Sequence, residues 1–135
     1  MLRSVIRNTF RKPEKICNQK QIDNLFKDGK SLKYGLFRLL HLESEAKGLS
    51  PVQLLIAVPK KNLRHAVTRN RMKRLIREAY RLNKHKLIDS CTKARKHCDI
   101  AIIFMGNQCV SQSETYTAIN ELLDRLILIN EKDSE

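Results

Sequence analysis

The side chains best suited to chemistry in this sequence form a dense row of cations between Arg69 and Arg81. At about 100° of rotation per residue, a helix over this segment gathers its cations and one amide on a single face. That face holds Asn70, Lys73, Arg74, Arg77 and Arg81, with Lys84 one turn further on. The opposite face holds Met72, Leu75, Ile76 and Ala79. We therefore predict a helix that packs on a core and presents cations, mostly bidentate guanidinium groups, to a polyanion.

The scarcity of acidic residues in this helix separates it from an ordinary solvated helix. Surface helices usually place acids at i,i+4 from their cations, whereas Glu78 is the one acid between Arg69 and Arg81. Cations at this spacing repel one another, and a bound polyanion would offset the repulsion. A plain solvated face is the alternative reading, but binding to a polyanion explains the pattern better.

Composition supports the same class of partner. The 135 residues are 41% hydrophobic, which suits one domain with a real core. The formal net charge is +13, and residues 59–97 alone carry fourteen Lys and Arg against two acids. Such a block favours nucleic acid or an anionic membrane surface. No apolar run approaches the roughly 18 residues of a membrane span, and Met1–Lys12 resembles a mitochondrial presequence only faintly.

The sequence contains no self-evident catalytic or metal site. The scattered histidines are His41, His65, His85 and His97. None lies in a zinc-protease, P-loop or nucleophile-elbow motif. A nuclease acting by itself would need acid and base groups that converge on one phosphate, which the sequence does not indicate.

The cysteines invite a zinc hypothesis that their spacing does not support. They are Cys17, Cys91, Cys98 and Cys109, with His97 as a further candidate ligand. The spacing matches no standard zinc site, and nothing indicates secretion. We therefore expect reduced, structural cysteines in a cytoplasmic protein.

Periodicity predicts the elements that position the cationic helix. We expect a helix over Lys20–Lys30 that ends near Gly29, strands over Tyr34–Leu42, Val52–Val58 and Ile100–Met105, the basic helix from its N-cap Thr68 to about Leu87, and a last helix over Ser113–Ile129. The order is α-β-β(-β)-α-β-α, the bracketed strand being optional. This is an α+β fold in which a small mixed sheet packs against helices.

We expect a single domain over residues 1–135. Residues 1–18 would form a mobile basic arm in which Phe10 and Ile16 are available to pack. Residues 130–135 would form a mobile acidic tail.

The segment Ala66–Glu78, AVTRNRMKRLIRE, closely resembles the signature of the bacterial ribonuclease P protein subunit. That family carries an Arg-Asn-Arg motif that continues into Lys-Arg and a further Arg. Phe26–Lys30 and Val58–Lys61 are similar to the family's flanking segments. One departure is Arg64-His65, where many members have Gly or Asn.

The resemblance implies a ribonucleoprotein endonuclease that removes the 5′ leader of precursor tRNA. Its RNA subunit performs the Mg²⁺-dependent hydrolysis, so this chain would be an accessory subunit without catalytic or metal-binding residues. The fold implied is an αβ sandwich with a left-handed βαβ crossover, against the usual right-handed rule.

The resemblance also implies two binding sites. The RNA subunit would be held by Arg69, Asn70, Arg71, Lys73, Arg74, Arg77 and Arg81. The leader would lie in a cleft between the first helix and the sheet, at Ile22, Phe26, Phe37 and Leu40. Phe26 could stack on an unpaired base, although a core role for it is an equal alternative.

Three rival functions remain open at the level of sequence. A ribosomal or general RNA-binding protein would use the same cations on any structured RNA. A DNA-binding protein would place the helix in the major groove, but strands rather than a helix-turn-helix precede Thr68. A protein that is itself a nuclease is the third.

Overall fold

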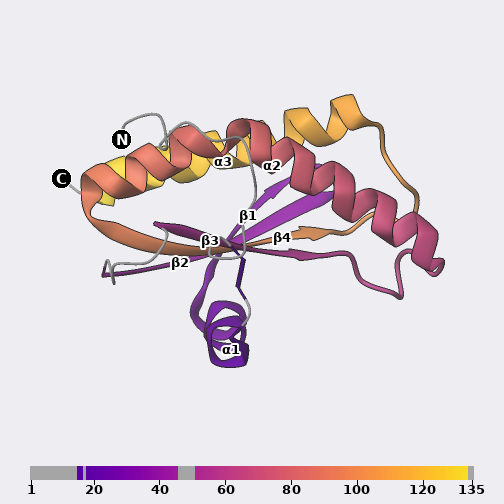
Figure 1. Cartoon of the computed structure of the whole chain (residues 1–135), viewed down its shortest axis with the longest axis horizontal. Coiled ribbons are helices and arrows are strands. Elements are labelled where there is room, and N and C mark those ends of the chain that lie inside the picture. Colours follow the sequence, from indigo (N-terminus) through magenta and orange to yellow (C-terminus); the bar gives the residue numbers. More distant parts are fainter. Residues whose placement is uncertain (1–14, 17, 46–50, 134–135) are drawn as a thin grey trace.

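The computed structural model describes residues 15–16, 18–45 and 51–133. These residues form three helices and four strands (Figure 1). In chain order they are α1 (Gln19–Asp28), β1 (Lys30–Tyr34), β2 (Phe37–Glu45), β3 (Val52–Ala57), α2 (Ala66–Ala94), β4 (Lys96–Phe104) and α3 (Gln112–Asp133). The predicted α+β class is confirmed.

The four strands form one mixed sheet in the order β1-β2-β4-β3. β2 lies antiparallel to both β1 and β4, whereas β3 lies parallel to β4. Because α2 joins the parallel neighbours β3 and β4, it is the crossover helix of a βαβ unit. The left-handed course of that crossover stays a prediction from the resemblance.

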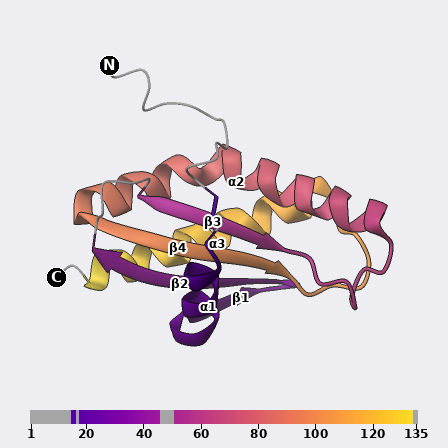
Figure 2. The same cartoon turned by 60° about the horizontal axis from the view of Figure 1, so that its bottom comes forward.

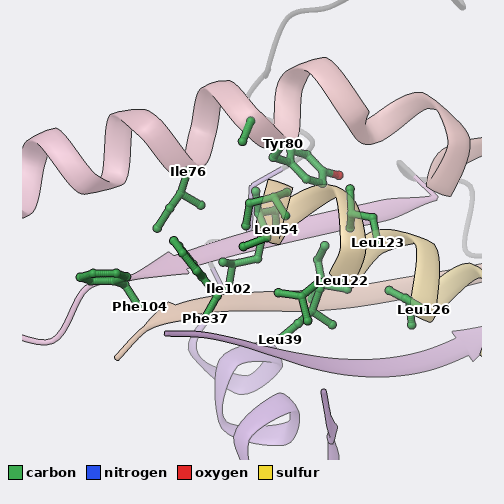
Figure 3. Packing of buried hydrophobic residues seen from close by; sticks show 14 of the residues in the cluster. Phe37, Leu39, Leu54, Ile76, Tyr80, Ile102, Phe104, Leu122, Leu123 and Leu126 are labelled. Carbon is green, nitrogen blue, oxygen red and sulfur yellow. The ribbon is translucent and has the colours of Figure 1, made fainter. Parts of the chain in front are cut away.

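The helices cover both faces of the sheet (Figures 1 and 2). α2 and α3 lie side by side on one face, and α1 crosses the other. The larger core fills the space under α2 and α3, where Leu54, Ile102 and Leu122 meet (Figure 3). A smaller core joins α1 to the sheet through Leu25 and Leu40. The central strand β4 is buried on both faces, as the continuous apolar run predicted.

The strand predicted over Tyr34–Leu42 is wrong as a single element, because a hairpin interrupts it. β1 ends at Tyr34 and β2 begins at Phe37. Gly35 turns the chain with a φ of 58°, a left-handed conformation that favours glycine in tight hairpin turns. The division therefore supplies the strand that the predicted element order had left optional.

Helix α2 is longer at both ends than predicted. It begins at Ala66, so Thr68 is not the N-cap; His65 takes that position without a side-chain capping bond. It continues past Leu87 to a left-handed cap at Arg95.

Lys84 is only 1% exposed, so it does not belong to the cationic face. The buried residues Met72, Ile76, Tyr80 and Lys84 follow steps of four, and each step rotates the buried stripe by about 40°. In the second half of the helix the buried stripe therefore includes the position of Lys84.

Some residues of the expected arm and tail take part in the fold where the structure describes them. Ile16 is buried, and its N–H donates to the carbonyl of Leu54 at 3.1 Å. The expected arm otherwise lies in residues 1–14 and 17, outside the described residues. α3 continues to Asp133 with Asn130 buried, so the expected tail is helical up to that point. No helix in the described ranges has the length and apolarity needed to cross a membrane.

Gly29 ends α1, as predicted, and its missing side chain is required there. Its N–H donates to the carbonyl of Leu25 at 2.9 Å. A Cβ at this position would lie 2.3 Å from that same carbonyl oxygen. The approach is too close for any other residue unless the backbone moves.

We expect Gly29→Ala to lower the free energy of unfolding by about 1–3 kcal/mol, since the added methyl group overpacks against backbone. Urea unfolding followed by circular dichroism measures the change. Gly35→Asn is the control, because Gly35 has open space around it and asparagine tolerates its positive φ. A loss from Gly29→Ala no larger than that of the control would contradict the argument.

Candidate nucleic-acid interface

One side of α2 presents a row of polar side chains that have no partner in the described part of the chain. We call Asn70, Lys73, Arg74 and Arg77, together with Arg71 about 100° further round the helix axis from Asn70, the cationic face. All are exposed except the half-buried Lys73. Among the described residues, none of them forms a hydrogen bond or an ion pair with another side chain. The buried Met72 and Ile76 anchor the opposite side of the helix, so these charges stand on a rigid support.

Arg69 differs from this face because its guanidinium binds the chain itself. Its Nη1 donates to the carbonyl oxygens of Leu63 at 2.9 Å and Arg64 at 2.8 Å. These bonds hold the connection between β3 and α2 against the first turn of the helix. The structure therefore gives Arg69 a role in positioning this loop, which sequence periodicity could not indicate.

Arg81 is also engaged, by the acid three residues before it. Its Nε donates to Oε2 of Glu78 at 3.2 Å, and the two groups form an ion pair. The hydrogen bond from Arg81 lowers the pKa of Glu78, and the same bond raises the pKa of Arg81. Arg81 therefore borders the cationic face, and Glu78 partly neutralises its charge.

The loop held by Arg69 adds cations that were not predicted as site residues. Lys60, Lys61 and Arg64 are exposed just before α2. The first turn of α2 contains no acid and has no side-chain cap, so its free amides add positive potential at the same place. The signal available in the sequence was that this loop belongs to the cation-rich block over residues 59–97.

Three of the four residues predicted for the leader cleft lie on the α1 side of the sheet. Phe26 is 50% exposed, Ile22 is half-buried one turn earlier on α1, and Leu40 is buried beneath it on β2. Ile22 and Leu40 belong to the smaller core, and Phe26 adds an aromatic ring on the same helix in reach of solvent.

Phe37 does not belong to that surface, and its assignment is corrected. It is 3% exposed and packs against Phe104 under α2 and α3, with 5.2 Å between ring centroids (Figure 3). Residues three apart in a strand point to opposite faces, so Phe37 and Leu40 cannot line one cleft. Alternation was visible in the sequence, but which face would meet α1 was not.

The other flank of α1 borders a cavity of about 490 Å³ with a polar lining. There Nε2 of His97 lies 2.7 Å from Oδ1 of Asp99, and Nε2 of Gln21 donates to Oε1 of Gln53 at 2.8 Å. Gln21 also reaches Asp99, at 3.3 Å. The bonds from Gln21 attach α1 to the sheet. The buried carboxylate makes this flank a poor site for phosphate.

The structure brings Cys91 and Cys98 together in the larger core but places His97 and Cys109 apart from them. Cys98 points from β4 toward the larger core, whereas His97 points to the α1 side. Cys109 lies elsewhere, 3.6 Å from the carbonyl of Thr68. A hydrogen bond with Cys91 and then burial raise the pKa of Cys98, and the same hydrogen bond lowers the pKa of Cys91. Across the described ranges, no three His, Cys, Asp or Glu side chains group as a metal site; Cys17 lies outside them.

Comparisons with known proteins agree with the motif and the fold. A family model described as Ribonuclease P matches residues 10–127. The ribonuclease P protein component of Chlorobium phaeobacteroides is 42% identical over 109 residues, covering 75% of each chain. That of Porphyromonas gingivalis is 31% identical over 115 residues, covering 85% of this chain and 84% of the relative.

A solved structure is similar over the same region. The RNase P protein from Thermotoga maritima superposes with a TM-score of 0.63 at 27% identity, covering 83% of this chain and 96% of that one. The family model spans most of the sequence, including the cationic face of α2 and the strands that support it. The chain therefore belongs to the ribonuclease P protein component family.

Proposed function

We propose that this chain is the protein subunit of ribonuclease P, which binds the catalytic RNA subunit and the 5′ leader of precursor tRNA. The holoenzyme would then cleave the leader endonucleolytically and leave the mature 5′ end. A general role in tRNA processing and an RNA partner follow from the family. The observation that carries the finer proposal is the cationic face, whose charges are rigidly held and unpaired within the described part of the chain.

The cationic face suits an RNA subunit because it neutralises phosphates. Binding releases condensed counterions, which makes affinity high and strongly dependent on salt. The exposed Lys60 and Lys61 extend the positive surface toward the sheet. Asn70 adds an amide that can read a base edge or a sugar hydroxyl.

The α1 side of the sheet suits a single-stranded leader. Phe26 offers a ring on which an unpaired base can stack. Arg38 shares the sheet face of Leu40, and Lys33 lies directly opposite it in the β1–β2 register. Both cations are exposed and can contact the phosphates of the leader whose base stacks on Phe26.

In this proposal the RNA subunit carries out the Mg²⁺-dependent hydrolysis. The chain would act by position and charge: it lowers the repulsion between RNA subunit and substrate, and so the magnesium requirement. The proposed place of action is the cytoplasm.

The deciding experiment adds the purified protein to a bacterial ribonuclease P RNA and precursor tRNA at low magnesium. We expect stimulated cleavage at the correct 5′ position, measured on sequencing gels. If the protein does not stimulate cleavage at the correct 5′ position, the proposal is refuted. Cleavage by the protein without RNA would support the nuclease alternative, and equal binding to unrelated structured RNA or duplex DNA would support the other two.

We expect Arg74→Ala or Arg77→Ala to weaken binding to the RNA subunit and to lower the slope of log affinity against log salt by about 1. The fold should persist, because both side chains are exposed and partnerless within the described residues. Filter binding across a salt series measures both quantities. Lys93→Ala, an exposed cation at the far end of α2, is the matched control. An equal effect from Lys93→Ala would mean that net charge, not the face, decides binding.

Phe26→Ala should reduce affinity of the holoenzyme for leader-bearing precursor about tenfold, as expected for one lost base stack. Affinity for mature tRNA should not change, because it lacks the leader. Tyr116→Ala removes an exposed ring from α3, on the other layer of the molecule, and serves as the control. The leader assignment fails if both RNA ligands lose affinity equally.

A further inference from the structure

A cavity of about 550 Å³ lies where the loop before α2 meets the turn after β4. Its lining, which we call the amide pocket, consists of Asn62, Leu63, Arg64, His65, Thr68, Asn107, Gln108 and Cys109. The volume falls within the roughly 300–1,000 Å³ of small-ligand sites. No carboxylate lines it, whereas the other three cavities described each include at least one. It therefore suits part of an anionic ligand.

Both walls of the amide pocket are held in place before any ligand binds. Arg69 bonds to the carbonyls of Leu63 and Arg64, and the N–H of Leu63 donates to Pro59 at 3.2 Å. The buried side chain of Leu63 belongs to the larger core. On the other wall, Cys109 contacts the carbonyl of Thr68. A preformed site loses little entropy on binding.

The polar groups of the pocket are available to a ligand. Asn62, Asn107 and Gln108 form no side-chain hydrogen bond with any residue that the structure describes. A side-chain amide both donates and accepts, which matches the edges of nucleobases. Arg64 and His65 are exposed and add planar groups on which an unpaired base can stack.

We propose that the amide pocket holds one unpaired nucleotide of the RNA that the cationic face binds. The base edge would meet the amides of Asn107 and Gln108, while its plane stacks on His65 or Arg64. The phosphates on either side would lie near Lys60, Lys61 and the cationic face. The inference rests on the proposed function, and the nucleotide belongs either to the RNA subunit or to the precursor leader.

The test uses the double variant Asn107→Ala/Gln108→Ala in the full chain. One arm measures affinity for ribonuclease P RNA alone; the other measures affinity of the assembled holoenzyme for precursor tRNA with and without its leader. We expect about a tenfold loss in one arm, the size of one lost bidentate base contact. The salt slope should not change, because neutral amides release no counterions. Asn120→Ala, an amide on α3 outside the pocket, is the control.

Loss in the first arm places the nucleotide in the RNA subunit, and loss confined to leader-bearing precursor places it in the leader. Loss in neither arm, or a loss matched by Asn120→Ala, overturns the inference. Because Asn107 and Gln108 are both exposed, we expect the double variant to fold. Its circular dichroism spectrum and the midpoint of its thermal unfolding check this. Arg74→Ala in parallel separates the two claims: if it weakens binding and the pocket variant does not, only the pocket assignment fails.

Discussion

The burial of one side of α2 against the sheet is the constraint on which the rest of this structure depends. Met72, Ile76 and Tyr80 are completely enclosed, and each buried side chain of this kind contributes about 1.5–3 kcal/mol. Repulsion between like charges on the exposed side costs only about 0.2–0.5 kcal/mol per pair. Burial therefore decides the orientation of the helix, and a face of uncompensated cations can persist on its other side.

The same sheet keeps two surfaces apart. β4 lies at the centre with its residues alternating between the two cores, so α2 and α3 pack on one face and α1 on the other. In the proposed function, this arrangement lets the cations of α2 hold the RNA subunit while the Phe26 side of α1 meets the leader. In that proposal, the strand shared by both cores would maintain the distance between the RNA subunit and the leader.

Residue type alone does not tell which cations of the block can act on a ligand. Arg71 and Arg74 are unpaired in the described part of the chain, whereas Arg69 is bonded to two loop carbonyls and Arg81 to Glu78. Arg69 nevertheless serves the surface indirectly, because it holds the loop that carries Lys60, Lys61 and Arg64. The proposed interface consists of charges displayed by α2 together with a loop that Arg69 of the same helix keeps in place.

Apart from the division between β1 and β2, the sequence by itself determined the element order, and with it the end of α1 at Gly29, the buried central strand and the cationic side of α2, because these follow from local periodicity and backbone geometry. The family motif lay within that helix and required no tertiary knowledge. The division at Gly35 was missed because apolar residues continue across the turn. Only the tertiary structure decided that Lys84 and Phe37 are buried and that Arg69 binds a loop. It also brought Asn62 beside Gln108 in one pocket, since such contacts depend on which distant elements pack together.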